Sequence, residues 1–353
     1  MRPFLFCYFH KISTFETSIK RRQYHIQSVM KDQKELITHI NESLRKLCYP
    51  EQPTGLFDPI RYILDLGGKR IRPVLALLST RLYSGDEEAT LQPALGIEVF
   101  HNFTLLHDDL MDKADRRRNK PTVHKKWDDN TAILSGDAMQ IMAYQLIGRT
   151  PAPYLKEVLD LFSTTAIEIC EGQQYDMEFE NRRDVTEDEY LEMIRLKTAV
   201  LLGCALKTGA ILGGASKTDA DLLYDFGENI GLAFQLKDDL LDVYADPEVF
   251  GKNIGGDILN NKKTYLLITA LTNATAAQRK EIDEWMNKTT FDPAEKIKRF
   301  TELYNETGAK DLCELKMKQF YRKGLESFRK VSITPDKKAD LQQLADELMY
   351  REM

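Results

Sequence analysis

Two short acidic segments carry the most distinctive chemistry in this sequence. "DDLMD" runs from Asp108 to Asp112, and "DDLLD" runs from Asp238 to Asp242. The outer aspartates of each segment are four residues apart, so a helix projects both carboxylates from one face. Such pairs suit Mg²⁺, which is commonly held by one or two carboxylates together with phosphate oxygens. A single copy would be interpreted as a solvent-exposed, acid-rich helix end. Two copies, each ending an apolar helix and followed by basic residues, favour a metal site.

Arginines follow the first segment. Arg117 and Arg118 offer planar guanidinium groups suited to bidentate contacts with phosphate. A polyanion that arrives with divalent metal ions would neutralise both the acids and the arginines. His101 lies seven residues before Asp108, on nearly the same helical stripe. This alignment favours ligand contact over the alternative role of a core histidine.

Another basic stretch, "GGKRIRP", precedes a long apolar helix. Lys69 and Arg72 lie near the expected N-terminus of this helix, which itself attracts phosphate. Helical spacing places Arg70 off the face that Lys69 and Arg72 share. The alternative interpretation is an exposed basic loop.

A glycine-rich stretch, "FGKNIGGDILNNKKT", follows the second acidic segment. It contains Lys252, Lys262 and Lys263, and its pattern is closer to a lid over a phosphate than to a Walker loop, whose pattern is absent.

Polar residues also interrupt apolar helices. Lys197 and Thr198 do so in "RLKTAVLLG", and Gln235 lies one short turn before Asp238. Buried polar groups need partners, and a cation–diphosphate site would supply them. Gln173 and Asp176, both within "EGQQYDMEF", give a weaker signal of the same kind.

Helical periodicity runs through the chain from Met30 onward, interrupted by turn signals such as Pro151 and Gly213-Gly214. No alternating run of strand length stands out. The sequence therefore predicts an all-α fold of long, mostly antiparallel helices. No spacer rich in Gly, Ser or Pro divides it, so we expect one domain over residues 30–353.

Composition excludes several functional classes. The chain has 353 residues and a net charge of −6, which does not favour nucleic-acid binding. Its five cysteines are scattered along the chain, and this pattern fits neither a disulfide framework nor a zinc site. No uninterrupted apolar run approaches the roughly 20 residues of a membrane span, so stable membrane insertion is not expected.

Residues 1–29 differ from the rest, being basic and aromatic with one acid, Glu16. They could form an amphipathic targeting segment. We favour the alternative, an extension outside the folded core with the native start at Met30, and we expect a cytoplasmic protein.

From about Met30 onward, the chain resembles the trans-isoprenyl diphosphate synthases of the polyprenyl synthetase family. The matching motifs occur in order: "GGKRIRP", "LLHDDLMDKADRRRNKPTVH", "EGQQYD", "LKTA", "FQLKDDLLDVYADPEVFGKNIGGD" and "NNKKT". The resemblance implies helices around a central cavity, a homodimer, and condensation of isopentenyl diphosphate with an allylic diphosphate.

The resemblance also implies specific roles for residues. Three Mg²⁺ ions would be bound by Asp108, Asp112 and Asp238. Isopentenyl diphosphate would be bound by Lys69, Arg72, His101 and Arg118. The allylic diphosphate would be bound by Arg117, Lys197, Thr198, Gln235, Lys252 and Lys262. Phe103 and Thr104 would form the floor for short products, so geranylgeranyl (C20) is expected slightly ahead of farnesyl (C15).

Three alternatives belong to other classes. A terpene cyclase would not need the isopentenyl site at Lys69, Arg72 and Arg118. A non-catalytic partner subunit fits poorly with intact aspartate clusters. A di-iron carboxylate bundle needs two E-x-x-H pairs, and only Glu98 and His101 form one.

Overall fold

The computed structural model describes residues 33–83, 87–245 and 254–350. The chain divides into two compact units. Unit 1 comprises Met1–Val74 and Glu98–Ala143, and unit 2 comprises Leu75–Ile97 and Tyr144–Met353. Each unit is described separately below. The expectation of one domain over residues 30–353 stays a prediction, and residues 1–29 lie outside the described residues.

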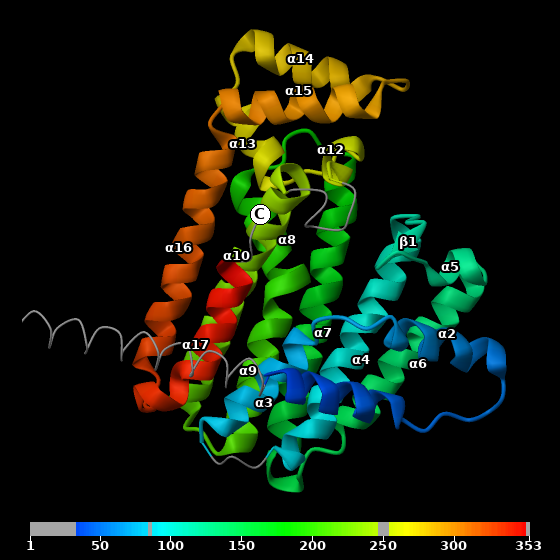
Figure 1. Cartoon of the computed structure of the whole chain (residues 1–353), viewed down its shortest axis with the longest axis vertical. Coiled ribbons are helices and arrows are strands. Elements are labelled where there is room, and N and C mark those ends of the chain that lie inside the picture. The colour runs from blue at the N-terminus through cyan, green and yellow to red at the C-terminus, as the bar shows by residue number, and fades with distance from the viewer. Residues whose placement is uncertain (1–32, 84–86, 246–253, 351–353) are drawn as a thin grey trace, which may run out of the picture. The chain divides into compact units, whose positions relative to one another are not determined.

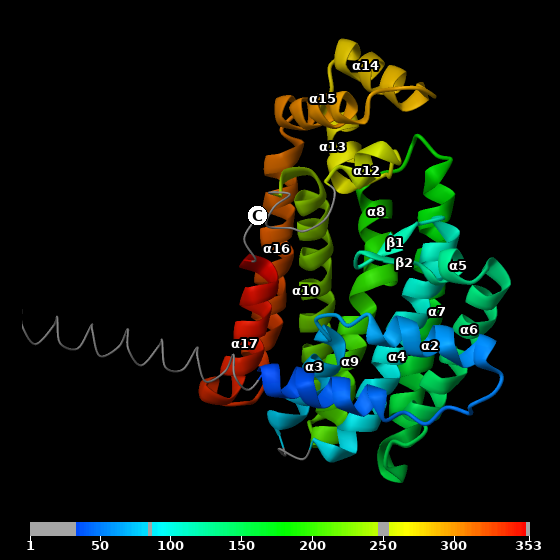
Figure 2. The same cartoon turned by 45° about the vertical axis from the view of Figure 1, so that its right-hand side comes forward.

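Unit 1 contains short helices, one hairpin and parts of longer helices (Figure 2). Its elements are a helix over residues 33–45, α2 (Thr54–Asp65), the start of α3 (Ile71–Arg81), the end of α4 (Glu88–Met111), β1 (Arg116–Arg117), β2 (Lys120–Pro121), α5 (Val123–Lys126) and most of α6 (Asp129–Ile147). A side chain at Gly136 on α6 would collide with the His107 ring on α4. This glycine therefore lets α6 pack closely beside the residue that precedes Asp108.

Unit 2 contains the longest helices (Figure 1). Its elements are the rest of α3, the start of α4, the end of α6, α7 (Ala152–Glu180), α8 (Glu187–Ile194), the π-helix η1 (Arg195–Ala199), α9 (Val200–Gly213), α10 (Lys217–Tyr244), α12 (Gly256–Leu259), α13 (Tyr265–Asn273), α14 (Ala276–Asn287), α15 (Pro293–Glu306), α16 (Ala309–Lys330) and α17 (Pro335–Tyr350). The α10 helix packs along α9 and α16, and η1 packs against α7 and α10.

Local sequence signals fix several of these helix ends. Thr186 and Thr275 each begin a helix with a capping box, in which the threonine and the third helical residue satisfy each other's backbone N–H groups. Gly214 ends α9 in the left-handed conformation that glycine adopts at little cost. These signals are readable in the sequence, which is why the helix boundaries follow its turn residues.

One stretch of the described helices, Glu187–Gly213, is long and apolar enough to span a membrane. It consists of α8, η1 and α9, and 78% of its most apolar window is buried inside the fold. Burial of this kind is typical of a core helix in a folded protein. The expectation of no stable membrane insertion stays a prediction.

The all-α prediction is confirmed, with one local difference. Two residues on each side of a turn form an antiparallel β pair, Arg116 with Pro121 and Arg117 with Lys120. A strand of two residues is too short to produce an alternating pattern, so periodicity could not predict it.

Candidate active site

The first aspartate cluster lies where α4 ends in unit 1. The backbone N–H of Asp112 donates to the carbonyl of Asp108 at 2.8 Å, so the helical turn continues through the cluster. Asp112 is exposed and Asp108 is partly exposed, whereas Asp109 between them is buried, at 3% exposure. The outer carboxylates are therefore the ones that solvent and a ligand can reach.

The hairpin after α4 returns an arginine to this cluster. Arg117 donates from Nε to Oδ2 of Asp109 at 2.7 Å, and its Nη2 lies 3.8 Å from Oδ2 of Asp108. Burial raises the pKa of Asp109, and Arg117 opposes that rise. Arg118 and Asn119 take the left-handed conformation that makes the tight turn. Arg117 thus orients the aspartates and still presents a guanidinium group beside them.

The "GGKRIRP" loop packs against the same hairpin. Gly68 has a φ of 138°, and a Cβ atom there would lie 2.7 Å from Nη2 of Arg118. Only glycine leaves room for this guanidinium group. Lys69 is exposed beside Gly68, and Arg72 lies in the first turn of α3. The loop therefore contacts Arg118, one of the residues predicted to bind isopentenyl diphosphate.

His101 lies in a strongly positive environment. Burial, followed by the charges of Arg72, Arg118, Arg117 and Arg70, holds the pKa of His101 well below its usual value of 6.5. Burial also lowers the pKa of Arg72 to about 10, and its buried Nε has no hydrogen-bond partner among the described residues. A bound anion would relieve both the charge repulsion and the unsatisfied donor.

Arg70 has a different environment, as its position off the shared face predicts. It is 4% exposed, pairs with Glu98 at 2.7 Å and donates to the Leu64 carbonyl at 2.6 Å. Because Glu98 is engaged by Arg70 in the core, the single E-x-x-H pair gives no support to a di-iron site.

In unit 2, two predicted lysines converge on Asp176 of α7. Lys197 Nζ lies 2.7 Å from Oδ2 of Asp176, and Lys262 Nζ lies 3.7 Å from the same oxygen. Burial opposes ionisation of Asp176, but the two lysines outweigh it and hold its pKa below the usual value. Near this pair, the buried Nε2 of Gln173 has no partner within the described part of the chain. Asp176 carried only a weak signal in the sequence.

A π-helix presents Lys197 and Thr198. The segment "RLKTA" forms η1, where the Val200 N–H donates to the Arg195 carbonyl five residues earlier. Gly172 of α7 packs on its backbone: a Cβ atom there would lie 2.8 Å from the carbonyl carbon of Leu196. Short π-helical segments are frequent at functional sites because they turn side chains out of the α-helical register.

A hydrogen-bond chain joins η1 to the second aspartate cluster. Thr198 donates to Oε1 of Gln235 at 3.2 Å, and Nε2 of Gln235 donates to Oδ1 of Asp239 at 3.2 Å. Tyr190 of α8 donates to the other oxygen of Asp239. Burial raises the pKa of Asp239 to about 7, and the bonds from Tyr190 and Gln235 oppose the rise. Sequence reasoning missed Tyr190, which had no motif of its own.

The outer aspartates of this cluster, Asp238 and Asp242, are partly exposed at the end of α10. Asp242 accepts from the backbone N–H of Asp257 at 3.0 Å. Burial, followed by the charge of Asp242, raises the pKa of Asp257 to about 8. The sequence pattern does not single out Asp257, and Lys252 lies outside the described residues.

The donor atoms at both clusters fit Mg²⁺, since all are carboxylate oxygens. Across residues 33–83, 87–245 and 254–350, no three acidic, histidine or cysteine side chains converge to enclose a metal ion by themselves. A magnesium ion held here would therefore complete its coordination with water or ligand oxygens, which is its usual preference.

Phe103 and Thr104 lie one turn before the first cluster. Phe103 is 8% exposed, and its ring centroid lies 5.3 Å from that of Phe100 and 4.8 Å from that of His107. The Thr104 hydroxyl donates to the His101 carbonyl at 2.8 Å. Aromatic rings thus fill this part of α4 in successive turns.

Comparisons with known proteins agree with this arrangement of motifs. Residues 53–304 match the polyprenyl synthetase family model. The chain is 39% identical to a geranylfarnesyl diphosphate synthase of Natronomonas pharaonis, over 70% of this chain and 76% of that protein. It is 34% identical to a geranylgeranyl pyrophosphate synthase of Geoglobus acetivorans, over 93% and 99% respectively.

Solved structures give the same result at the level of the fold. A crystal structure of a geranylgeranyl pyrophosphate synthase superimposes with a TM-score of 0.86 and 46% identity, covering 91% of this chain and 99% of that one. The family model spans most of the chain, and the relatives exceed 30% identity. The chain therefore belongs to the polyprenyl synthetase family.

Proposed function

We propose that this enzyme condenses isopentenyl diphosphate with an allylic diphosphate, head to tail, to give a short trans-prenyl diphosphate. The observation that carries the proposal is the set of cations around His101, which has an unsatisfied buried donor on Arg72 and surplus positive charge. A terpene cyclase has no second diphosphate to bind and would not need this set. Isopentenyl diphosphate is the ligand assigned to Lys69, Arg72, His101 and Arg118.

The allylic diphosphate is assigned to a second set of polar groups. Its members are Arg117, Lys197, Thr198, Gln235, Lys252 and Lys262. The positions of Lys197 and Lys262 around Asp176 support this assignment, because the carboxylate holds both ammonium groups close together. Three magnesium ions are assigned to Asp108, Asp112 and Asp238, where they would neutralise charge on the leaving diphosphate.

The remaining chemistry depends on the protein's own groups. Breaking the allylic C–O bond leaves a carbocation, and the C4 double bond of isopentenyl diphosphate attacks it. The Thr198 hydroxyl, the Gln235 amide and the backbone carbonyl near Lys197 are dipoles that can stabilise this cation. A proton then leaves to restore the alkene, and the departing diphosphate accepts it. Water must be excluded, because it would convert the cation to an alcohol.

The product we propose is geranylgeranyl diphosphate, with farnesyl diphosphate second. Phe103 packed between Phe100 and His107 supports a short product, because these rings leave little room for an extended chain. Relatives named geranylgeranyl and geranylfarnesyl diphosphate synthases support the same length class.

The active form we propose is a homodimer. The α6 helix supports this assembly, because Ile133, Leu134 and Ile141 are 46%, 60% and 62% exposed. Large apolar side chains gathered on one helix are typical of a protein interface.

One assay tests the reaction and the product together. Purified protein is incubated with Mg²⁺, isopentenyl diphosphate and, separately, the C5, C10 and C15 allylic diphosphates, and the products are separated by chain length. We expect condensation with each, ending mainly at C20. Absence of condensation with all three would reject the proposal, and release of a cyclic hydrocarbon from an allylic diphosphate alone would favour a cyclase.

A further inference from the structure

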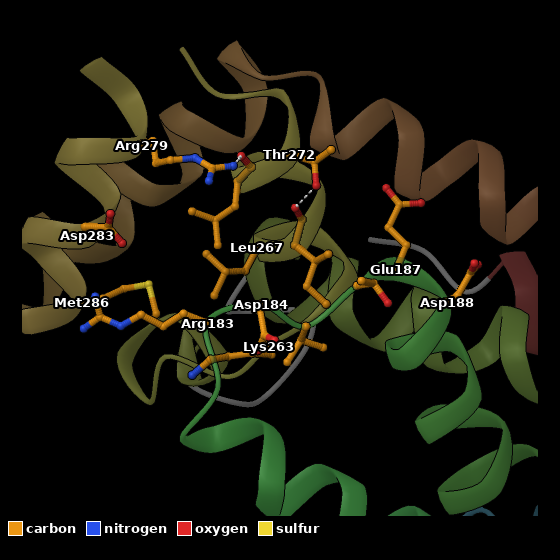
Figure 3. Close-up of a pocket in the computed structure, with 14 residues that line it drawn as sticks. Arg183, Asp184, Glu187, Asp188, Lys263, Leu267, Thr272, Arg279, Asp283 and Met286 are labelled. Carbon is orange, nitrogen blue, oxygen red and sulfur yellow. Dashed lines mark hydrogen bonds between the residues drawn. The ribbon is translucent and has the colours of Figure 1, made fainter. Parts of the chain in front are cut away.

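A separate cavity of about 640 Å³ lies within unit 2. It is bounded by the segment that leads into α8, by α13 and by α14 (Figure 3). No residue assigned above to magnesium or to either diphosphate lines it. Its volume is within the range of about 300–1,000 Å³ that small-molecule sites occupy.

Three cationic side chains line this cavity and bond only to neutral oxygens. Lys263 Nζ donates to the Glu180 carbonyl at 2.8 Å, and Arg183 donates to the Asn287 side-chain oxygen at 2.6 Å. Arg279 donates to the Leu271 carbonyl. Within the described residues, none of the three cations forms an ion pair with a carboxylate. Each can therefore form a charge-assisted hydrogen bond with an anion.

The carboxylates of the cavity are mostly engaged or distant. Asp184 pairs with Arg182 at 2.9 Å, and Glu187 accepts hydrogen bonds from the hydroxyl groups of Tyr265 and Thr269 on α13. Figure 3 shows Glu187 and Asp188 on one side of Leu267, away from the guanidinium groups. On the cationic side, three positive groups lie with two carboxylates, Asp283 and Asp184, of which Asp184 is paired with Arg182.

The wall between these groups is apolar. Its accessible part is formed by Leu271 of α13 and Met286 of α14, whereas Leu267 and Ile268 are 2% and 4% exposed. Burial lowers the pKa of Lys263, which marks its ammonium group as partly desolvated at the edge of this wall. A cavity with cations at one side and an apolar wall suits a molecule with an anionic head and an apolar body.

The chain itself separates this cavity from the proposed active site. Lys262 and Lys263 are consecutive, yet Lys262 extends to Asp176, whereas Lys263 extends to the Glu180 carbonyl at the cavity. Asn261, with a φ of 52°, anchors this turn by donating from its side chain to the Met286 carbonyl at 3.2 Å. The side chains of these neighbouring lysines thus extend to different parts of unit 2.

We propose that this cavity is a second ligand site, for an amphipathic phosphate whose head binds Arg183 and Lys263 and whose apolar chain lies on Leu271 and Met286. The assignment rests on the cavity alone and holds whether or not the proposed reaction is correct. The same chemistry is offered by a free prenyl diphosphate and by a phosphate headgroup in a lipid bilayer.

The test is direct binding, read by the fluorescence of Trp285. This side chain is 7% exposed on α14, beside Met286, and the chain has only one other tryptophan, Trp127. In the Trp127→Phe background, with magnesium chelated, dodecyl phosphate should change the fluorescence saturably. Inorganic phosphate should bind much more weakly, because it cannot use the apolar wall.

Charge variants make the test specific. Lys263→Gln and Arg183→Gln should each weaken dodecyl phosphate binding about tenfold, since each removes a charge-assisted hydrogen bond. Asp283→Asn should tighten it, because it removes a negative charge from the cationic side of the cavity. Lys280→Gln on the same helix and Asp238→Ala in the active site should leave it unchanged. Circular dichroism melts confirm that each variant is folded.

Three results would overturn the proposal: no saturable binding of dodecyl phosphate, equal affinities in all cavity variants, or loss of binding in Asp238→Ala.

Two further experiments, the two arms of the test, then identify the source of the ligand. Geranylgeranyl diphosphate in solution is titrated into the Asp238→Ala protein, and vesicles with and without phosphatidic acid are tested for co-sedimentation. Tighter binding in the first arm identifies a prenyl diphosphate as the ligand, and co-sedimentation that Lys263→Gln abolishes identifies a membrane lipid. Failure of both arms also overturns the proposal.

Discussion

The middle aspartates of the two clusters differ physically from the outer ones. Asp109 and Asp239 are each 3% exposed, and each has a specific partner, Arg117 for the first and Tyr190 for the second. The outer carboxylates remain accessible at the helix ends. The middle residue of each cluster therefore anchors the helix end, while its neighbours are left to bind a ligand.

Loss of an outer aspartate should abolish most of the activity. Asp108→Ala or Asp238→Ala should lower kcat by about 100-fold or more, because the ligand they hold stabilises charge that develops in the transition state. Asp115→Ala is the control, since Asp115 is an exposed acid just beyond the first cluster. Steady-state kinetics with both substrates at saturation measures the effect. Near-normal turnover of either cluster variant would remove that residue from the metal site.

His101 should make stability dependent on pH. Its pKa is well below 6.5 in the folded protein, so below about pH 6.5 the unfolded chain binds a proton that the folded chain does not. Neutral His101 therefore contributes to the free energy of unfolding. This stabilisation is fully present above about pH 6.5 and is lost as the pH falls. Thermal melts at pH 7.5 and 5.5 should therefore show a smaller acid loss for His101→Gln than for the wild type. The exposed His39→Gln is the control and should behave like the wild type.

The candidate site is readable from the sequence where a residue type conflicts with its surroundings. Lys197, Thr198 and Gln235 are polar positions within apolar helices, and the structure joins Thr198 to Gln235. Tyr190 and Asp257 offered no such conflict. A tyrosine in an amphipathic helix and an aspartate in a polar loop are ordinary until long-range packing brings them to a buried carboxylate.

At the scale of elements, two features escape periodicity. The π-helix η1 occupies five residues whose apolar spacing continues that of α8 and α9, so a helical pattern cannot distinguish i+5 from i+4 bonding over so short a length. The hairpin depends on left-handed Arg118 and Asn119, of which only the asparagine is a recognised turn residue. In both cases a tertiary contact selects the local geometry. The contact is with Gly172 for η1 and with Asp109 for the hairpin.

Gly172→Ala should show that α7 holds η1 in place. Alanine normally favours a helix interior by about 1 kcal/mol over glycine, but here its Cβ would collide with the backbone at Lys197. We expect a net destabilisation of about 1–3 kcal/mol, as in other overpacked cores, and a lower kcat. Gly55→Ala in α2 is the matched control, because nothing lies within 4 Å of a Cβ there. Urea unfolding measures the stability of each variant, and steady-state kinetics measures its kcat. Equal stability and equal kcat of the two variants would contradict the role of Gly172 in holding η1.

The α4 helix should set product length. An extended isoprene unit is roughly as long as one helical turn of about 5.4 Å. Phe103→Ala removes one ring and exposes the next, Phe100, which is fully buried and 5.3 Å away. The product should therefore lengthen by about one isoprene unit and stop there. Adding Phe100→Ala should lengthen it further. Chromatography of the dephosphorylated products gives the distribution, and an unchanged length would mean that another element forms the floor.

At the scale of the whole molecule, the sequence predicted the fold class because periodic apolar positions persist through most of the chain. Amphipathic helices of this length have few ways to bury their apolar faces except against other helices. The division into two units was not predicted, since it runs through the interiors of α3, α4 and α6 and carries no linker composition. Composition detects boundaries in loops, whereas a boundary within continuous helices leaves no such signal.

Assembly is the remaining whole-molecule property, and α6 gives it a specific test. Leu134 and Ile141 are seven residues apart, so they lie on the same stripe of the helix, and both are about 60% exposed. Replacing both with glutamate places two charges where a dimer would bury apolar surface, which should convert the protein to a monomer. Light scattering after size exclusion should give twice the mass of one chain for the wild type and the mass of one chain for the variant.

The control is the double variant Glu157→Gln with Asp160→Asn on α7, which also changes charge at two exposed positions and should stay dimeric. A wild type that is monomeric at micromolar concentration, or a double glutamate variant that stays dimeric, would exclude this face of α6 as the interface.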